Sequence, residues 1–366
     1  MMYDLLKDFD PQKIIKANSL PEETECLQII KKKNINFNDI AKLLNSESST
    51  VLEAMALESR NKTLKRFGRT VSLYTPIYLS SECVNSCIYC SFNHNNQLER
   101  KTLSFDELEK ECIEIKKFGF DSILLVSGES KKHAPVDYLN ECIKIAKKHF
   151  SYTALEIYPV DFEDYQLFKQ SGVDGVTLYQ ETYNETLYPK YHLRGPKTDF
   201  KYRIGTMERA GKAQIKKLNI GALLGLNDWK EETLYLIFHL QFLKKHFWES
   251  ELAVSFPRIR KHAGSFNPPF PVTDQQLVKM MLVMRLFDET LGLLISTREN
   301  AAFRNSLLKL GITSMSAGSK TSPGGHIGAE SQTQFEISDD RTPLQIQEYL
   351  AAQGYEPVYK DWEQGI

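Results

Sequence analysis

Residues 83–90 read CVNSCIYC and place Cys83, Cys87 and Cys90 in one short stretch. The apolar run at residues 71–79 precedes them, so we expect the cysteines in a loop that follows a β-strand. Thiolates this close together can hold three corners of one metal cluster, and soft thiolates suit iron–sulfur clusters. A cube of four irons bound by three cysteines keeps one iron free of protein ligands. The stretch therefore predicts a catalytic cluster.

A structural zinc site is the alternative interpretation of the same cysteines. Such a site needs a fourth protein ligand, which usually comes from a second CxxC or HxxxH pair. No such pair follows in the sequence, although His94 is close enough in sequence to be the fourth ligand. The other cysteines, Cys26, Cys112 and Cys142, stand alone in helix-like segments. The open-iron cluster is preferred because catalytic metal sites are the ones that keep an open position.

Composition and charge exclude several classes of protein. The 366 residues are 42% hydrophobic and 25% charged, which suffices for one large α/β domain. A net charge of -1 provides no general attraction to nucleic acid or to an anionic membrane. Six cysteines are too few for a disulfide scaffold in a chain of this length. Since the sequence shows neither a membrane-spanning stretch nor a signal peptide, we expect a cytosolic protein without a nucleic-acid or membrane partner.

The chain alternates short apolar runs with longer amphipathic ones from residue 71 onward. We expect strands at residues 71–79, 122–127, 153–158, 175–180, 218–224, 252–256, 293–296 and 312–316. Helices are expected before the first strand at residues 49–67 and between the strands at residues 105–118, 136–150, 162–170, 203–213, 230–247, 274–291 and 301–308. This rhythm predicts the α/β class and a closed (β/α)8 barrel of the TIM type over residues 71–319, with its working face at the C-terminal ends of the strands. Residues 1–70 form a helical extension in this prediction. Residues 320–366 form a C-terminal extension packed on the barrel.

Polar residues recur where the predicted strands end. Interior strands should be apolar on both faces, so a charge at a strand end is either solvated or functional. Repeated polar strand ends favour one shared site at the barrel mouth. They include Ser127-Gly128-Glu129, Glu156, Gln180-Glu181, Arg258, Arg298-Glu299 and Ser316-Ala317-Gly318-Ser319.

The cysteine spacing, with aromatic Tyr89 just before the third cysteine, resembles that of the radical S-adenosylmethionine (SAM) enzymes. The resemblance implies two cofactors, one 4Fe-4S cluster and SAM. It also implies that the open iron binds the amino and carboxylate groups of SAM, and that Tyr89 packs near the adenine. An iron–sulfur redox sensor is the non-enzymatic alternative.

Three residues are assigned to the methionine part of SAM by this resemblance. Glu129, in the sequence VSGE, would bind the ammonium group, and Ser127 stands where the family has its first glycine. Arg203 is predicted to open the helix before the fifth strand and to bind the carboxylate through a bidentate contact. The ordinary alternative for Arg203 is a surface helix residue.

The nucleoside part of SAM is assigned in the same way. Gln180 and Glu181 end the fourth strand, where the family usually contacts the ribose, and Glu181 is also counted among the catalytic residues. Gly221 and Gly225, in IGALLGL, would let the backbone approach the adenine closely. The alternative is that both glycines relieve packing.

Further segments narrow the resemblance to the aromatic amino-acid lyases of the superfamily, above all the tyrosine lyases of thiamine thiazole biosynthesis. It extends over about residues 64–362 and is carried by RFGRTVSLYTPIYLS, YQETYNETLYPKYHLRGPKTDF, VSFPRIR, ISTREN and SAGSKTSPGG. The related hydrogenase maturases carry a second cluster on a C-terminal cysteine pair, whereas the last cysteine here is Cys142. A tryptophan lyase remains the third possibility.

The resemblance implies a reaction and its partners. SAM is cleaved to methionine and a 5'-deoxyadenosyl radical, and the Cα–Cβ bond of L-tyrosine then breaks to give 2-iminoacetate and p-cresol. Thiazole synthase is the implied protein partner, and a flavodoxin or ferredoxin is the implied electron donor.

Position along the chain suggests the contacts of the tyrosine substrate. Arg298 should bind its carboxylate, because a buried carboxylate requires a charged or multiply hydrogen-bonded partner. Ser316 or Ser319 should orient its amino group. The alternative is that Arg298 pairs with Glu299 or with another acid at the rim.

Overall fold

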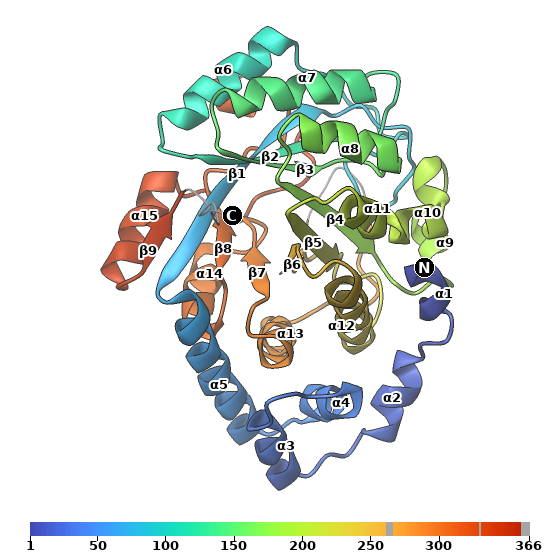
Figure 1. Cartoon of the computed structure of the whole chain (residues 1–366), viewed down its shortest axis with the longest axis vertical. Helices are drawn as coiled ribbons and strands as arrows, with labels where there is room; N and C mark the ends of the chain where they lie inside the picture. The colour runs from blue at the N-terminus through green and yellow to red at the C-terminus, as the bar shows by residue number, and fades with distance from the viewer. Residues whose placement is uncertain (261–265, 329–330, 360–366) are drawn as a thin grey trace.

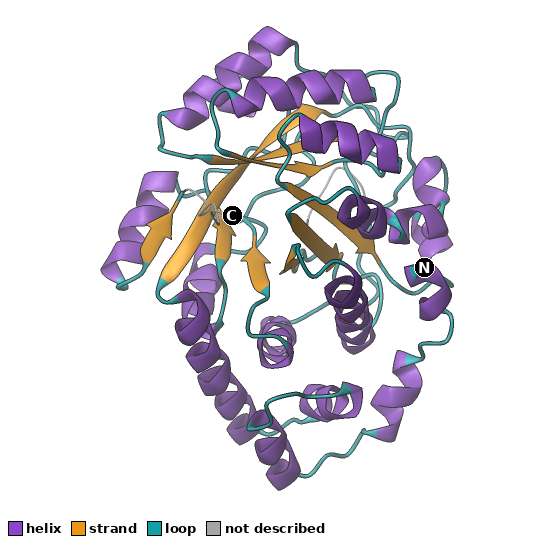
Figure 2. Cartoon of the chain, viewed as in Figure 1, coloured by secondary structure: helices purple, strands orange, loops and turns teal. Residues whose placement is uncertain are grey.

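The computed structural model describes residues 1–260, 266–328 and 331–359. Its centre is a barrel of parallel strands surrounded by helices (Figures 1 and 2). Each strand pairs with the next along the chain, and β1 pairs with both β2 and β8, which closes the barrel. The predicted (β/α)8 fold is confirmed. The barrel strands are β1 (Thr70–Ser80), β2 (Ser122–Ser127), β3 (Tyr152–Glu156), β4 (Gly175–Glu181), β5 (Lys217–Ala222), β6 (Glu251–Ser255), β7 (Gly292–Ile295) and β8 (Ser314–Ser316).

Helices follow the strands and cover the outer face of the barrel. Capping boxes begin α6 at Ser104 and α13 at Thr273, which explains why these helices start where the sequence predicts. The helices of the barrel are α6 (Phe105–Lys116), α7 (Val136–Lys147), α8 (Phe162–Gln170), α9 (Tyr188–Tyr191), α10 (Phe200–Ile204), α11 (Thr206–Lys212), α12 (Trp229–His246), α13 (Asp274–Phe287) and α14 (Ala301–Leu307).

One predicted helix, at residues 203–213, is wrong in its bounds. Gly205 ends α10 and begins α11, so the segment forms two short helices. Arg203 therefore lies in the last turn of α10 and does not open a helix.

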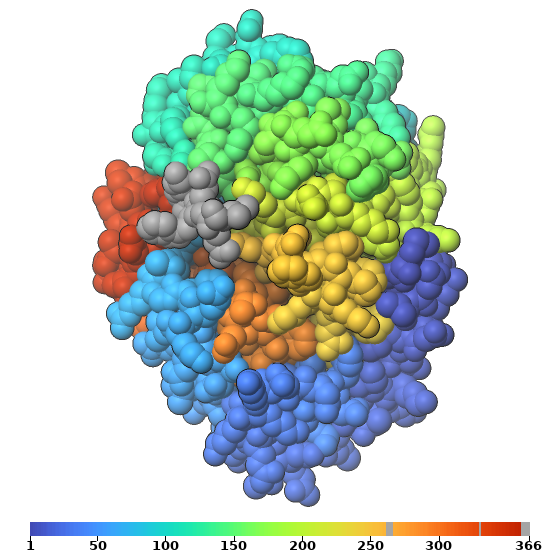
Figure 3. Space-filling model, in the orientation of Figure 1, coloured from blue at the N-terminus to red at the C-terminus, as the bar shows by residue number. Residues whose placement is uncertain are grey.

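The N-terminal helices pack along one side of the barrel and form one end of the molecule in the space-filling view (Figure 3). Helices α2 and α4 contact α12, and α4 and α5 contact α13. Within the described residues, no helix has the length and apolar character that a membrane span requires. The N-terminal elements are α1 (Met2–Leu6), α2 (Pro11–Ala17), α3 (Glu23–Ile30), α4 (Phe37–Asn45) and α5 (Ser49–Phe67).

The C-terminal segment returns to the barrel in a way that the sequence analysis did not predict. After α15 (Pro343–Ala352), strand β9 (Glu356–Val358) pairs in parallel with the start of β1 (Figure 1). The carbonyl of Tyr359 also accepts a hydrogen bond from the Asp121 amide, 3.2 Å away, just before β2 begins. A three-residue strand with proline at its centre carries no recognisable strand pattern.

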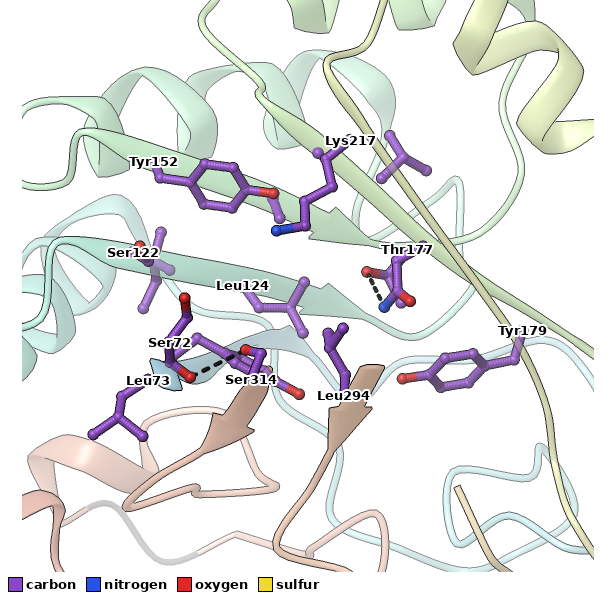
Figure 4. A pocket seen from close by; sticks show the side chains of 16 residues that line it. Ser72, Leu73, Ser122, Leu124, Tyr152, Thr177, Tyr179, Lys217, Leu294 and Ser314 are labelled. Carbon is purple, nitrogen blue, oxygen red and sulfur yellow. Dashed lines mark hydrogen bonds between the residues drawn. The ribbon is translucent and has the colours of Figure 1, made fainter. Parts of the chain in front are cut away.

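The barrel interior contradicts the expectation of strands that are apolar on both faces. Leu73 and Ile123 are buried under the helices, whereas the inward residues mix polar side chains such as Ser72 and Thr177 with the apolar Leu124 and Leu294. Figure 4 shows a cavity toward the N-terminal ends of the strands, with Ser72, Ser122, Tyr152, Thr177, Lys217 and Ser314 on its wall. Barrels of this type normally fill their interior with branched apolar side chains. Here Asn219 donates hydrogen bonds to Thr177 and Ser255 across the interior.

Candidate active site

The three cysteines of the CVNSCIYC loop open into one cavity at the C-terminal ends of strands β1–β4. Its empty space, including the open mouth, is about 660 Å³, within the range of about 300–1,000 Å³ that small-molecule sites occupy. We call it the cysteine cavity. Its polar lining consists of Cys83, Asn85, Cys87, Cys90, Ser127, Gly128, Glu129, Glu156, Tyr179, Glu181, Lys197, Arg203 and Gln334.

The geometry of the thiols fits a cluster better than a single ion. In the part of the chain that the structure describes, no three His, Cys, Asp or Glu side chains converge as the ligands of one ion would. A zinc ion needs all its ligands at about 2.0–2.3 Å from one point, whereas each cysteine of an iron–sulfur cube binds a different iron. Burial raises the pKa of Cys87 to about 12 and that of Cys90 to about 11, so metal binding must displace protons from these thiols.

Two side chains other than the cysteines hold the loop in place. Asn85 donates to Glu129 Oε2 at 2.5 Å and accepts from the Lys197 amide at 3.0 Å. Arg100 donates to the carbonyls of Ser81 and Asn93, each at 2.8 Å, and so ties the two flanks of the loop together. Neither residue was recognised from the sequence, because its role depends on partners that only folding brings together.

Gly128 allows β2 to approach the cysteine loop. A Cβ atom at this position would lie 2.4 Å from the carbonyl oxygen of Glu82 and 3.4 Å from Cys83 Cβ. We therefore expect Gly128→Ala to displace Cys83, to reduce the iron bound per protein severalfold after reconstitution, and to lower the melting temperature. The matched control is Gly205→Ala, whose nearest neighbour would be the flexible Arg209 side chain. Full iron content in Gly128→Ala would contradict this account.

Glu129 and Ser127 both line the cysteine cavity, and their contact with the ammonium end of SAM stays a prediction. Glu129 is 8% exposed and accepts the hydrogen bond from Asn85. One carboxylate oxygen of Glu129 is thus fixed by the cysteine loop. These contacts keep the carboxylate beside the metal ligands.

Glu181, Lys197 and Arg203 form a buried ionic group on the same wall. Lys197 Nζ lies 2.6 Å and Arg203 Nη2 lies 3.2 Å from Glu181 Oε1. Burial alone would raise the pKa of Glu181, but Lys197 and Arg203 outweigh it and hold that pKa below its ordinary value. Arg203 also donates through Nε and Nη2 to the Tyr179 carbonyl. The Arg203 guanidinium is therefore fixed at the cavity edge. Lys197 is a further site residue that the sequence analysis did not predict.

The backbone at Glu181 adopts the left-handed region, with a φ of 72°. Such a conformation is costly for a residue other than glycine and needs support from its surroundings. The buried carboxylate of Glu232, on α12, accepts hydrogen bonds from Thr182 Oγ1 at 2.5 Å and from the Tyr183 amide at 3.2 Å. Burial raises the pKa of Glu232 to about 7. These bonds fix the turn that directs Glu181 toward the cavity.

Tyr89 is held by a buried histidine. Its hydroxyl lies 2.7 Å from His192 Nε2, and His192 Nδ1 lies 2.8 Å from the Tyr188 carbonyl. Since a carbonyl can only accept, Nδ1 carries the proton and Nε2 accepts from Tyr89. Burial lowers the pKa of His192 to about 3, which keeps the ring neutral. Tyr89 also packs on the apolar cluster of Tyr191, Leu223 and Leu226.

Gln180, Gly221 and Gly225 do not line the cysteine cavity. Gln180 is buried between the two inward residues Tyr179 and Glu181. A Cβ at Gly221 would lie 2.6 Å from the ring of Tyr179, and Gly225 has a φ of +121°. The packing alternative thus accounts for both glycines, and their contact with adenine stays a prediction.

Arg298 does not pair with Glu299. The Glu299 carboxylate accepts from Arg258 Nε at 2.8 Å and from Arg260 Nη2 at 2.6 Å. Arg298 lies instead over the ring of Phe335, 3.5 Å from its centroid, and has no ion pair with a described residue. The alternative in which Glu299 neutralises Arg298 is therefore wrong.

The two serines predicted beside Arg298 lie apart. Ser316 Oγ accepts from the Thr297 amide at 3.0 Å and so supports the turn that carries Arg298. Ser319 lines a different cavity, together with Thr75, Phe118 and His326, and its hydroxyl has no partner among the described residues. The structure thus keeps Ser316 next to Arg298 but places Ser319 on another cavity.

Comparison with family models gives two matches. Residues 77–237 match the Radical SAM superfamily, and residues 255–356 match the Biotin and Thiamin Synthesis associated domain. The cofactors of a radical SAM enzyme are a 4Fe-4S cluster and SAM, in agreement with the three thiols of the cysteine cavity. The second match crosses residue 319, so the predicted division there stays a prediction.

Solved structures confirm the fold. HydG, a maturase of the FeFe-hydrogenase, superposes with a TM-score of 0.94 at 31% identity over 97% of this chain and 81% of that chain. HydG from Carboxydothermus hydrogenoformans gives a TM-score of 0.91 at 30% identity, over 98% of this chain and 84% of that chain.

Two curated relatives are similar over most of their length. The 2-iminoacetate synthase of Salmonella typhimurium is 39% identical over 90% of this chain and 88% of its own. The enzyme of the same name from Escherichia coli is 40% identical over 89% of this chain and 87% of its own. The chain therefore belongs to the radical SAM superfamily and, within it, to the 2-iminoacetate synthase family.

Proposed function

We propose that the protein cleaves the Cα–Cβ bond of L-tyrosine to 2-iminoacetate and p-cresol and converts SAM to 5'-deoxyadenosine and methionine, for thiamine thiazole synthesis. Its full-length similarity to two 2-iminoacetate synthases supports this reaction. The observation that carries the proposal is the cysteine cavity, where three thiols share one wall with Glu129, Glu181 and Arg203.

The residues of the cavity divide between metal and SAM. Cys83, Cys87 and Cys90 would bind one 4Fe-4S cluster, which supplies the electron that cleaves SAM. Glu129 would receive the ammonium group, because its carboxylate lies beside the cysteine loop. Arg203 would bind the carboxylate of SAM, and Glu181 would accept from the ribose hydroxyls, since both lie at the cavity edge.

The substrate would lie deeper in the barrel mouth. Among the residues that the structure describes, Arg298 is a cation available for a carboxylate, because the nearby arginines Arg258 and Arg260 are already paired with Glu299. Ser316 supports the turn that carries Arg298. An enclosed barrel suits this chemistry, because the protein must position the substrate and exclude competing reactions.

Hydrogenase-maturase activity is the second candidate, favoured by the close superposition on HydG. A second cluster would need further thiols, and the printed sequence has no cysteine after Cys142. Cys26, Cys112 and Cys142 are buried in helices away from the cysteine cavity. The simpler tyrosine lyase is therefore preferred.

Assay of the reconstituted, reduced protein with tyrosine and tryptophan side by side tests the proposal. We expect 5'-deoxyadenosine, p-cresol and glyoxylate, the hydrolysis product of 2-iminoacetate, from tyrosine alone. An indolic acid from tryptophan would indicate a tryptophan lyase. Absence of 5'-deoxyadenosine with either substrate would support a redox sensor.

Thiazole synthase is the proposed recipient of the product, and a flavodoxin or ferredoxin the proposed electron donor. An imine hydrolyses readily in water, so direct transfer would protect it. We expect cross-linking between this protein and thiazole synthase, and less free glyoxylate when the synthase is present. Unchanged glyoxylate without any cross-link would count against direct transfer.

A further inference from the structure

Two residues of opposite charge lie at the barrel mouth without ion pairs. Glu156 ends β3 and lines the cysteine cavity, and Arg298 follows β7. No ion pair joins either side chain to a described residue, yet each is close enough to affect the other's surroundings. Arg298 is the strongest influence that favours the charged form of Glu156. Strands β3 and β7 stand four strands apart in the closed barrel, so the strand ends that carry the two residues lie on opposite sides of its mouth.

Glu156 differs in this respect from the other acids of the cysteine cavity. Glu129 accepts a hydrogen bond from Asn85, and Glu181 pairs with Lys197 and Arg203. Glu156 is partly exposed and lines the cavity, and a carboxylate that is largely removed from bulk water without a cation partner is costly; such residues cluster at functional sites. Glu156 is thus the acid of this wall that remains available to a cationic ligand.

The groups that face Glu156 come from several elements. They are Tyr74 and Tyr78 of β1, Tyr179 and Glu181 of β4, Lys197 of the segment after α9, and Arg298 after β7. The aromatic rings form walls around the charges, and the hydroxyl of Tyr179 donates a hydrogen bond that favours the charged form of Glu156 without supplying a cation. Burial raises the pKa of Glu156 to about 7, although Arg298 opposes this change. The carboxyl group can therefore hold or release a proton near neutral pH.

An α-amino acid carries a carboxylate and an ammonium group on one carbon. These two charges are complementary to those of Arg298 and Glu156. We propose that Glu156 binds the α-ammonium group of the substrate opposite Arg298 and accepts one of its protons. This inference rests on the proposed function. The N–H bond of the ammonium breaks, an O–H bond forms on Glu156, and the amine keeps the electron pair. No electron is gained or lost in this step.

Binding of three ligands to the cluster-loaded protein, with SAM present and no reductant, tests the proposal without turnover. The ligands are tyrosine, tyramine, which lacks the carboxylate, and 3-(4-hydroxyphenyl)propanoate, which lacks the ammonium. For the wild type we expect loss of the ammonium group to weaken binding on the order of a hundredfold. In Glu156→Gln that penalty should fall below about fivefold, because tyrosine binds less well while the deaminated acid binds at least as well as before. A collapsed site would weaken both ligands.

Glu231→Gln is the matched control, since Glu231, on α12, accepts a hydrogen bond from Asn227 and lies outside the cysteine cavity. This control should keep the wild-type ratio between the affinity for tyrosine and the affinity for 3-(4-hydroxyphenyl)propanoate. The pH dependence gives a second measurement: below pH 7 the protonated Glu156 is neutral, so tyrosine affinity of the wild type should fall, whereas that of Glu156→Gln should stay constant. An unchanged ammonium penalty in Glu156→Gln would overturn the inference and leave the proposed function intact. If the wild type bound no tyrosine, the proposed function would fail and the inference with it.

Discussion

The Cys90→Ala protein should lose the visible absorption of the cluster and cleave no SAM, because two thiolates cannot hold a cube that already has one open iron. Cys90 lines the cavity at the end of its loop, and its amide donates to the Cys87 carbonyl at 3.2 Å. Cys83→Ala and Cys87→Ala should behave alike, since all three cysteines line the same wall. Iron analysis and anaerobic assay of 5'-deoxyadenosine measure both effects.

Cys142→Ala is the matched control for this experiment. Cys142 is fully buried on α7, where burial raises the pKa of its thiol to about 12 and keeps it protonated. We expect normal iron content and SAM cleavage, with a loss of about 1 kcal/mol in stability for the small cavity created. Full activity in Cys90→Ala, or loss of the cluster in Cys142→Ala, would contradict the ligand assignment.

The sequence predicted the fold well because the strands carry strong local signals. Strand β2 begins and ends at the predicted residues, and helices α5 and α8 match their predicted spans. The caps of these helices and the apolar pattern of the strand are set by residues close together in the sequence. Strand β9 was missed because its pairing with β1 depends on a distant segment. The split at Gly205 was missed because helical periodicity continues across it.

The site could be predicted only where the spacing of residues in the sequence indicates their chemistry. The cysteines follow directly from CVNSCIYC, whereas Lys197 and Glu232 become recognisable only when the turn after β4 is folded. The polar part of the barrel interior was missed because interior strands were expected to be apolar on both faces. Inward residues such as Ser72 and Lys217 line a cavity, so their positions do not require apolar side chains.

Arg298→Lys should weaken tyrosine binding far more than it affects the cluster. Lysine keeps the positive charge but loses the planar fork that makes two parallel bonds to a carboxylate. Loss of one hydrogen bond to a charged group costs about 1.5–3 kcal/mol, which corresponds to roughly a tenfold to hundredfold weaker affinity. The contact of Arg298 with the Phe335 ring, at 3.5 Å, would also weaken, because the ammonium group stacks less well on an aromatic face.

Turnover should fall further than affinity in Arg298→Lys, since a carboxylate held by one bond can rotate. Displacement of a reacting group by about 1 Å can cost on the order of a hundredfold in rate. We therefore expect SAM cleavage to continue slowly with little p-cresol formed, so that the ratio of 5'-deoxyadenosine to p-cresol rises. Arg341→Lys serves as the control, because Arg341 pairs with Asp339 outside the cysteine cavity and should leave that ratio unchanged. If Arg298→Lys bound tyrosine with wild-type affinity and kept the wild-type product ratio, the substrate carboxylate would have to lie elsewhere.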